Sequence, residues 1–286
     1  MKRNPRPLLA VILGTNEIAS AVGVHMRRAE WDVVLSYDPF PPVVRRGMAF
    51  HDALFGDRRA IENIEGVRTE TATEIAAALT NPARLAVTRR SLPELLAIRP
   101  IEVLIDARMQ KHRTTPDLRG AAHLAVGLGP RFRVGENCDI AVETRPARCG
   151  SVVVAGSTDE ADGISSQLGG AGPERFVYAD RAGRWHAPIE IGAPVACRSM
   201  LGHLDGQPVL APLDGIVRGI VRDGLEVPPR VKLVEIDPRG CDARWSGIDE
   251  RGRGIAEATV RAIKMKSTRL AMTRSFVSAG PIHMYG

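Results

Sequence analysis

The stretch Leu8-Leu-Ala-Val-Ile-Leu-Gly-Thr-Asn-Glu-Ile-Ala19, followed by Asp32-Val-Val-Leu-Ser36, decides the fold. Its first six residues form an unbroken apolar run, which is typical of a strand covered on both faces. Ile18, Val22 and Met26 then recur every four residues, on one helical face, and Asn16 is suited to cap that helix. Strand, helix and strand make a βαβ unit, so we predict a parallel sheet.

The same alternation continues through the first half of the chain. Apolar runs predict further strands, and capped amphipathic segments predict the helices between them. We therefore expect a Rossmann-like α/β domain over residues 1–174. Its expected helices are 73–79 and 92–98, and its expected strands are 84–87, 102–105, 123–126, 140–142 and 151–155.

After a segment rich in Gly, Ser and Asp at 156–174, the sequence pattern changes from alternating strands and helices to short strands and tight turns. Turn pairs at Asp205-Gly206, Asp214-Gly215 and Asp223-Gly224 recur about every nine residues, which is typical of an antiparallel barrel or sandwich. We predict a β-rich domain over 175–248 and a C-terminal helix and tail over 249–286, with the tail loose after Lys264. The expected strands are 193–197, 201–204, 207–210, 215–221, 227 and 232–236.

Composition narrows the classes of function. The 286 residues are 44% hydrophobic and carry a formal charge of +6, but aromatic residues are only 4%, so a nucleic-acid surface is not expected. The first apolar run is too short to span a bilayer, which predicts a cytoplasmic protein without a membrane anchor. The cysteines and histidines have no metal-binding spacing, so no metal is expected. A basic surface suits an anionic small molecule.

Candidate binding residues follow the strand ends. Gly14 and Asn16 occupy the turn where Rossmann domains bind phosphate, although Asn16 and Ala19 replace the second and third glycines of the fingerprint. The turn could equally serve only to reverse the chain. Asp38, which follows the second strand, could meet a ribose or could be a turn residue before the proline bend.

A second group of candidates follows the later strands. Arginine forks match phosphate and carboxylate oxygens, so Arg45 and Arg46 predict an anion site, with a solvated surface pair as the alternative. Ligands of open α/β sheets bind at the carboxyl ends of the strands, where several loops should converge. A thiol near arginines could have a depressed pKa, or could simply be a packing residue. These loops contribute Asp106, Lys111, Gly127, Gly129, Glu143, Arg145 and the thiol of Cys149.

The order of several motifs resembles the accessory proteins of selenium-dependent molybdenum hydroxylases, which are related to the xanthine dehydrogenase accessory proteins. The similarity runs from about residue 8 to 264. Its motifs are Val43-Val-Arg-Arg46, Ala49-Phe-His-Asp-Ala-Leu-Phe-Gly56, Ile105-Asp-Ala-Arg-Met-Gln-Lys111, Val126-Gly-Leu-Gly-Pro-Arg-Phe132, Ala141-Val-Glu-Thr-Arg145, Gly215-Ile-Val-Arg-Gly-Ile-Val-Arg-Asp-Gly224 and Lys232-Leu-Val-Glu-Ile-Asp-Pro-Arg-Gly240.

That resemblance implies a maturation factor that holds or delivers a molybdopterin-type cofactor to a molybdenum hydroxylase apo-enzyme. It implies binding roles for Arg45, Arg46, Asp106, Lys111, Gly127, Gly129, Glu143 and Arg145. A nucleotide is a further candidate ligand. Two alternatives stay open: an NAD(P)-dependent oxidoreductase, and a noncatalytic scaffold that recruits the apo-hydroxylase. No pattern specifies catalytic turnover, and a homo-oligomer is compatible with the sequence.

Residues 192–237 also resemble a biotinyl/lipoyl carrier domain, with Val209-Leu-Ala-Pro-Leu-Asp-Gly-Ile-Val217 in place of the carrier hairpin. A carrier requires a lysine at the tip of that hairpin, and Leu213-Asp214 stands there instead. We therefore expect a structural or docking module of barrel-sandwich type.

Overall fold

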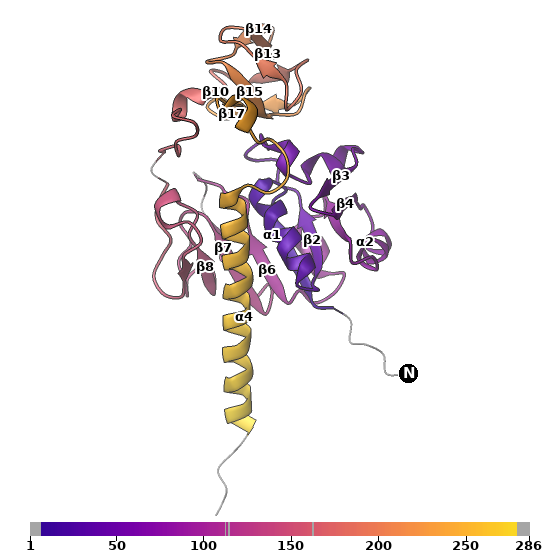
Figure 1. The fold of residues 1–286 in the computed structure, drawn as a ribbon. Coiled ribbons are helices and arrows are strands. Elements are labelled where there is room, and N and C mark those ends of the chain that lie inside the picture. Colours follow the sequence, from indigo (N-terminus) through magenta and orange to yellow (C-terminus); the bar gives the residue numbers. More distant parts are fainter. Residues whose placement is uncertain (1–6, 112, 114, 162, 279–286) are drawn as a thin grey trace, which may run out of the picture.

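The computed structural model describes residues 7–278 apart from 112, 114 and 162, with only the backbone described for 267–278. The chain forms an α/β unit with a nine-stranded sheet, and two four-stranded antiparallel sheets stand beyond one end of it (Figure 1). The βαβ start is confirmed: β1 (Leu9–Leu13) and β2 (Asp32–Ser36) pair in parallel, joined by α1 (Glu17–Arg28).

The large sheet has the strand order β3-β4-β5-β2-β1-β6-β7-β8-β9. It is mixed: β3 runs antiparallel to β4 and β9 antiparallel to β8, whereas the other pairs are parallel. The prediction missed the β3–β4 hairpin. The bounds are β3 (Arg59–Ile61), β4 (Ile64–Arg68), α2 (Ala72–Leu79), β5 (Arg84–Thr88), α3 (Leu92–Leu96), β6 (Val103–Asp106), β7 (Leu124–Leu128), β8 (Ile140–Val142) and β9 (Val152–Val153).

Both faces of this sheet are covered, which explains the unbroken apolar run in β1. Ala10 and Ile12 pack into the core beneath α1 and the C-terminal helix. Leu9, Val11 and Leu13 point to the opposite face and pack with side chains of α2 and α3. Successive residues of a strand alternate between faces, so a strand buried on both sides has no polar position.

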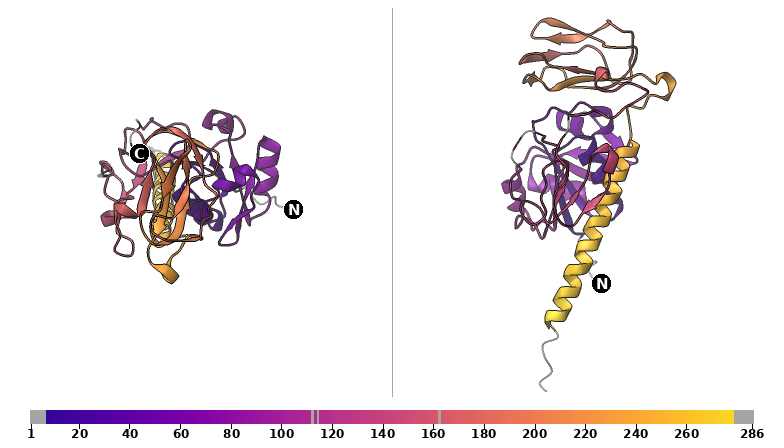
Figure 2. Two further views of the ribbon diagram at one scale, coloured as in Figure 1. Left: turned by 90° about the horizontal axis from the view of Figure 1, so that it is seen from above. Right: turned by 90° about the vertical axis from the view of Figure 1, so that its left-hand side faces the viewer.

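The C-terminal helix α4 (Glu250–Ser278) returns to the α/β unit and lies along α1 (Figures 1 and 2). Ile255, Ala256 and Ile263 are buried there. The helix continues past Lys264 to Ser278, so the expected loose tail is wrong for that stretch, while 279–286 lie outside the described residues. No helix formed by the described residues is long and apolar enough to cross a bilayer.

The β-rich second half is confirmed at the level of its two antiparallel sheets, in the orders β10-β17-β15-β12 and β14-β13-β11-β16. They share a core around Trp185, which is fully buried. The prediction missed the first two strands. The bounds are β10 (Phe176–Tyr178), β11 (Gly183–His186), β12 (Pro194–Val195), β13 (Met200–Leu204), β14 (Gln207–Leu210), β15 (Gly215–Ile220), β16 (Glu226–Val227) and β17 (Lys232–Asp237).

This β-rich part of the chain, residues 175–248, is called the β domain below, and it stands over the carboxyl edge of the large sheet (Figure 2). The segment after β2 makes the join, because the amide of Ile220 in β15 donates to the carbonyl of Val44 at 2.8 Å. The approach is close enough that a Cβ at Gly219 would lie 2.8 Å from the Val44 oxygen, and one at Gly47 would lie 2.2 Å from the carbonyl oxygen of Trp245. Small residues are therefore needed at this join.

The turn between β1 and α1 is held by contacts within the protein. The side-chain oxygen of Asn16 accepts from the amides of Ile18 and Ala19, which confirms it as the helix cap. Its amide group donates to the carbonyl of Ala107 after β6, at 2.8 Å. Gly14 has φ +110°, and a Cβ there would lie 3.1 Å from the same carbonyl oxygen. Asn16 thus joins the two strands at which the strand order reverses.

Asn16→Ala should lower the free energy of unfolding by about 1–2 kcal/mol, because α1 loses its cap and the Ala107 carbonyl loses its donor. Asn16→Ser keeps a capping oxygen but cannot reach across to Ala107, so its loss should be smaller. Urea unfolding followed by circular dichroism measures both values. Equal losses in the two variants would show that the link to Ala107 contributes nothing.

Candidate functional site

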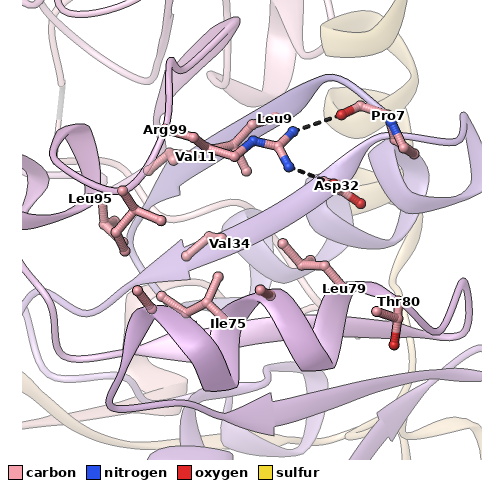
Figure 3. A pocket seen from close by; sticks show the side chains of 13 residues that line it. Pro7, Leu9, Val11, Asp32, Val34, Ile75, Leu79, Thr80, Leu95 and Arg99 are labelled. Atoms are coloured by element: carbon pink, nitrogen blue, oxygen red, sulfur yellow. Dashed lines mark hydrogen bonds and ion pairs between the residues drawn. The ribbon is translucent and has the colours of Figure 1, made fainter. Parts of the chain in front are cut away.

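Two cavities lined by described residues are candidate ligand sites, and the larger of these two is apolar. It measures about 330 Å³ and lies between α2, α3 and the face of β1 and β2. Figure 3 shows Ile75, Leu79 and Leu95 around it. Its charged groups are Asp32 and Arg99, which bond to each other at 2.9 Å, and Arg99 also donates to the carbonyl of Pro7. This cavity therefore offers no charge for a polar ligand.

The second cavity, of about 130 Å³, lies between the two domains and is strongly basic. We call it the interdomain cleft. The loops after β2, β6, β7 and β8 reach it from the large sheet, and β10 and β17 close it from the β domain. Residues 159, 161 and 164–166 also border it. Among the described residues, its cationic lining residues are Arg45, Lys111, Arg145, Arg175, Lys232 and Arg251, and its acidic ones are Glu143 and Asp159.

A buried carboxylate behind the cleft ties the two domains together. Glu235 of β17 is 1% exposed, and Arg45 donates to both of its oxygens, at 2.7 and 3.0 Å. Arg175 donates to one of these oxygens at 3.3 Å, and Arg218 of β15 lies 3.6 Å from it. Three guanidinium groups from separate segments therefore surround one carboxylate.

The same network continues into the helices of the α/β unit. Arg45 lies 3.4 Å from Glu17 in the first turn of α1 and 3.7 Å from Asp249. Asp249 accepts from Arg218 at 2.8 Å and from the amide of Gly252, so it also caps α4. The network thus fixes the join from both sides.

Charge and burial act in opposite directions on these groups. Burial alone would raise the pKa of Glu235, but the positive charges of Arg45, Arg218 and Arg175 outweigh it and hold the pKa below its usual value. Burial likewise lowers the pKa of Arg218, and the nearby Arg45 adds to this effect. Glu235 is therefore an anion at neutral pH, and its negative charge stabilises the buried guanidinium groups around it.

Two lysines of the cleft differ from these paired arginines. Within the part of the chain that the structure describes, the side chains of Lys111 and Lys232 make no hydrogen bond and no ion pair. Arg251 donates only to the carbonyl of Thr144, so its charge also has no carboxylate partner there. The cleft therefore presents positive charge that its own acidic groups do not neutralise.

Four of the residues singled out from the sequence line this cleft: Arg45, Lys111, Glu143 and Arg145. The carboxylate of Glu143 is buried, and it accepts from the backbone amides of Thr144, Arg145 and Asp159 at 2.7–2.8 Å. Glu143 therefore shapes the loop after β8 instead of facing a ligand. Arg145 lies 3.6 Å from Asp159, which also lines the cleft.

Arg46 does not join Arg45, which corrects the expected pair. It turns away from the cleft, donates to the carbonyl of Ile220 at 2.8 Å and bonds to the buried carboxylate of Asp52 at 2.6 Å. The 3-10 turn η1 (Arg46–Met48) begins at Arg46, and this change in the backbone makes the side chains of Arg45 and Arg46 point in different directions. Arg46 is a structural residue of the join.

Of the remaining candidates, none lines the cleft. The carboxylate of Asp106 is held by Arg108 at 2.6 and 2.9 Å, and Asp38 accepts from Gln110 at 3.0 Å. The ring of Phe132 covers Gly127. Gly129, with φ +108°, packs beside Met109 next to the cleft, and Gly14 and Asn16 hold the β1–α1 turn.

The thiol of Cys149 does not match the activated group considered from the sequence. Burial raises its pKa, and the charge of Arg251 only partly opposes this. Its closest polar partner is the carbonyl of Arg251 at 3.9 Å. Of the two alternatives left open by the sequence, the structure therefore favours the packing residue, which lies against the core of the α/β unit, and at neutral pH the group is a thiol.

Sequence reasoning missed the residues that the β domain and α4 supply: Arg175, Phe176, Lys232 and Arg251. Each lies outside the loops that follow the strands of the large sheet, where the sequence predicted the site. The only available signal was Lys232 itself, at the start of one of the motifs that carry the family resemblance. Among the described residues, no group of three or more His, Cys, Asp and Glu side chains is placed to hold a metal ion.

Comparisons with known proteins give one relative in sequence. The chain is 29% identical over 261 residues to the uncharacterized protein YqeB of Escherichia coli strain K12, which covers 90% of this chain but 47% of that protein. The chain thus spans about half the length of the curated relative it matches. No protein-family model matches the chain.

Similarity to solved structures is weak. An aspartoacylase family protein from Mesorhizobium loti is 8% identical with a TM-score of 0.28, covering 83% of this chain and 86% of that one. The ectoine utilization protein EutE from Ruegeria pomeroyi is 20% identical with a TM-score of 0.21, covering 29% and 27%. These scores are too low to support an argument about fold or function.

Glu235→Ala should lower the free energy of unfolding by about 3–5 kcal/mol, because it leaves buried guanidinium groups without their counter-charge. Glu226→Ala is the matched control, since Glu226 pairs with Arg184 on the exposed surface and its loss should cost under about 1 kcal/mol. Urea unfolding at pH 7 measures both. A similar small loss in the two variants would contradict the role given to Glu235.

The same carboxylate predicts a pH dependence. Its pKa is lowered on folding, so its contribution to stability is present above the unfolded value of about 4.3 and is lost as pH falls through the lower folded value. Unfolding free energies measured between pH 7 and pH 3 should therefore fall less steeply in Glu235→Gln than in the native protein. Parallel curves would assign the acid sensitivity to other carboxylates.

Proposed function

We propose that this protein binds an anionic, phosphate-bearing small molecule in the interdomain cleft and serves as a maturation factor for a molybdenum hydroxylase. The observation that carries the proposal is the excess of positive charge in the cleft, where Lys111, Lys232 and Arg251 have no carboxylate partner within the described chain. Such a cleft attracts anions and strengthens their hydrogen bonds because its walls exclude part of the solvent.

The molybdopterin-type cofactor is our first choice of ligand, and it follows from the resemblance to accessory proteins of molybdenum hydroxylases. A phosphate at the end of an organic group matches the lysine and arginine side chains in the cleft. The cavity of about 130 Å³ holds a phosphate and its neighbouring atoms, while the remainder of the ligand would lie at the open side. The client in this proposal is the apo-hydroxylase.

Two features of the fold support the domain types in this proposal. The order β5-β2-β1-β6-β7-β8 is that of doubly wound nucleotide-binding domains, which favours a Rossmann-like first domain. Two small antiparallel sheets around a shared core favour a barrel-sandwich second domain of biotinyl/lipoyl type. Asp214, at the expected carrier position, accepts from the amide of Cys197 at 2.7 Å and so has a structural use.

The NAD(P)-dependent alternative gains little from the β1–α1 turn. Asn16 already accepts from the first free amides of α1, and this is the position where a dinucleotide would place its pyrophosphate. The scaffold alternative has one specific observation in its favour: the cross-strand partners Met200 and Leu210 on β13 and β14 are 54% and 44% exposed. In that case this edge would bind the apo-hydroxylase.

Lys111→Ala combined with Arg251→Ala should reduce ligand binding at least about tenfold, because it removes two positive charges that have no carboxylate partner within the described chain. Arg181→Ala combined with Arg184→Ala is the matched control, since it removes the same charge from an exposed part of the β domain. The proteins are purified from a host that makes molybdopterin, and released pterin is quantified by fluorescence.

Pterin that copurifies with the native protein and the control, but not with the cleft variant, would support the proposal. Native protein that carries no pterin and also fails to bind phenyl phosphate would refute the ligand role. In that event, capture of the apo-hydroxylase that is lost in Met200→Ser combined with Leu210→Ser would favour the scaffold.

A further inference from the structure

Lys232 differs from the other two unpaired cations of the cleft, Lys111 and Arg251, because its ammonium group packs against aromatic rings. It begins β17, and its ammonium group lies 3.4 Å from the centre of the Phe176 ring and 5.9 Å from that of Tyr178. The side chain is half-buried, and it forms part of the cleft wall. No carboxylate of the described residues lies within ion-pair distance of it.

The groups around this ammonium are mostly cationic. On its own strand Glu235 attracts it, but the oxygens of that carboxylate are shared by three arginines. Across the cleft, Glu143 is held by backbone amides, and Asp159 accepts from Arg148. From the other elements packed around the cleft, the charged or titratable groups are Arg175 before β10, Tyr178 on β10, Lys111 after β6, Arg45 after β2, Arg145 after β8 and Arg251 at the start of α4.

These surroundings make the charge of Lys232 easy to lose. Burial lowers its pKa to about 8, and the positive charges of Lys111, Arg45 and Arg175 act in the same direction against the attraction of Glu235. The contact with the Phe176 ring favours the charged form, but a cation–π contact is worth less than an ion pair with a carboxylate. The ligand-free cleft therefore holds a lysine that is partly neutral above neutral pH.

Building on the proposed function, we propose that Lys232 recognises the anionic group of the ligand and takes up a proton when that group binds. A dianionic group such as a phosphate monoester supplies the negative charge that Lys232 lacks, because no described carboxylate of the cleft pairs with it. Its arrival favours the ammonium form, and the proton comes from the solvent. The lone pair of the neutral amine takes a proton from the buffer and forms an N–H bond, and no other covalent bond changes. The ligand gains a charged hydrogen bond, and the protein gains at most one proton.

Isothermal titration with phenyl phosphate in two buffers of different ionisation enthalpy measures this proton uptake directly. Phenyl phosphate is a dianion above about pH 7, so the ligand itself contributes little to the titration at higher pH. We expect uptake of about 0.1 proton per ligand at pH 7 and about 0.9 at pH 9, with affinity falling about tenfold over that interval.

Lys232→Arg is the matched variant, because its guanidinium stays charged throughout this range. It should bind phenyl phosphate with little proton uptake and a flat pH dependence. Lys232→Met should bind at least about tenfold more weakly, and its melting temperature without ligand should rise, since an unpaired charge leaves a half-buried position. Sulfate, a dianion at every pH used, serves as a second probe.

The outcomes separate this inference from the proposed function. Equal proton uptake by the native protein and Lys232→Arg, or unchanged affinity in Lys232→Met, would overturn the role of Lys232 while the anion site stands. Failure of the native protein to bind either probe would overturn both. Circular dichroism of each variant confirms that it is folded before it is titrated.

Discussion

The buried carboxylate of Glu235 is the constraint on which the arrangement of this molecule depends. A carboxylate that is 1% exposed is stable as an anion only with close cationic partners. Those partners come from three places: Arg45 from the loop after β2, Arg175 from the turn before β10, and Arg218 from β15. The β domain must therefore stand where the three side chains converge, and the cleft is the space that this placement leaves.

This network does not by itself make the cleft basic. Besides Glu235, Arg45 lies within ion-pair distance of Glu17 and Asp249, and Arg218 lies within ion-pair distance of Asp237 and Asp249. The uncompensated charge comes instead from Lys111 and Lys232, which the described acidic residues do not neutralise. Because Arg45 and Arg175 also line the cleft, substitutions inside the network will disturb both the join and the attraction for anions.

Sequence patterns predicted the features that depend on neighbouring residues, such as strands and helix caps. The strand predicted from the apolar run of β1 is confirmed, because both of its faces are covered. The cap predicted at Asn16 is also confirmed, because its side-chain oxygen accepts from free amides of the helix. The β3–β4 hairpin was missed because Ile61 and Ile64 flank a turn too short to show an alternating pattern. Arg45 and Arg46 are adjacent, yet only the backbone turn that begins at Arg46 decides which of them faces the cleft.

The location of the candidate site follows from how each strand end uses its polar groups. At the ends of β1 and β6, the side-chain oxygen of Asn16 accepts from helix amides and its amide group donates to the carbonyl of Ala107. The hydrogen-bonding groups at the point where the strand order reverses are therefore already bound within the protein. At β8, Glu143 fills the neighbouring set of backbone amides. An anion can compete with neither, because both are intramolecular and preorganised. An anion must therefore be bound by the side chains that line the interdomain cleft. Half of the cationic lining residues belong to the β domain and α4. A phosphate-binding role for this fold therefore requires the second domain, and the first domain alone would not supply it.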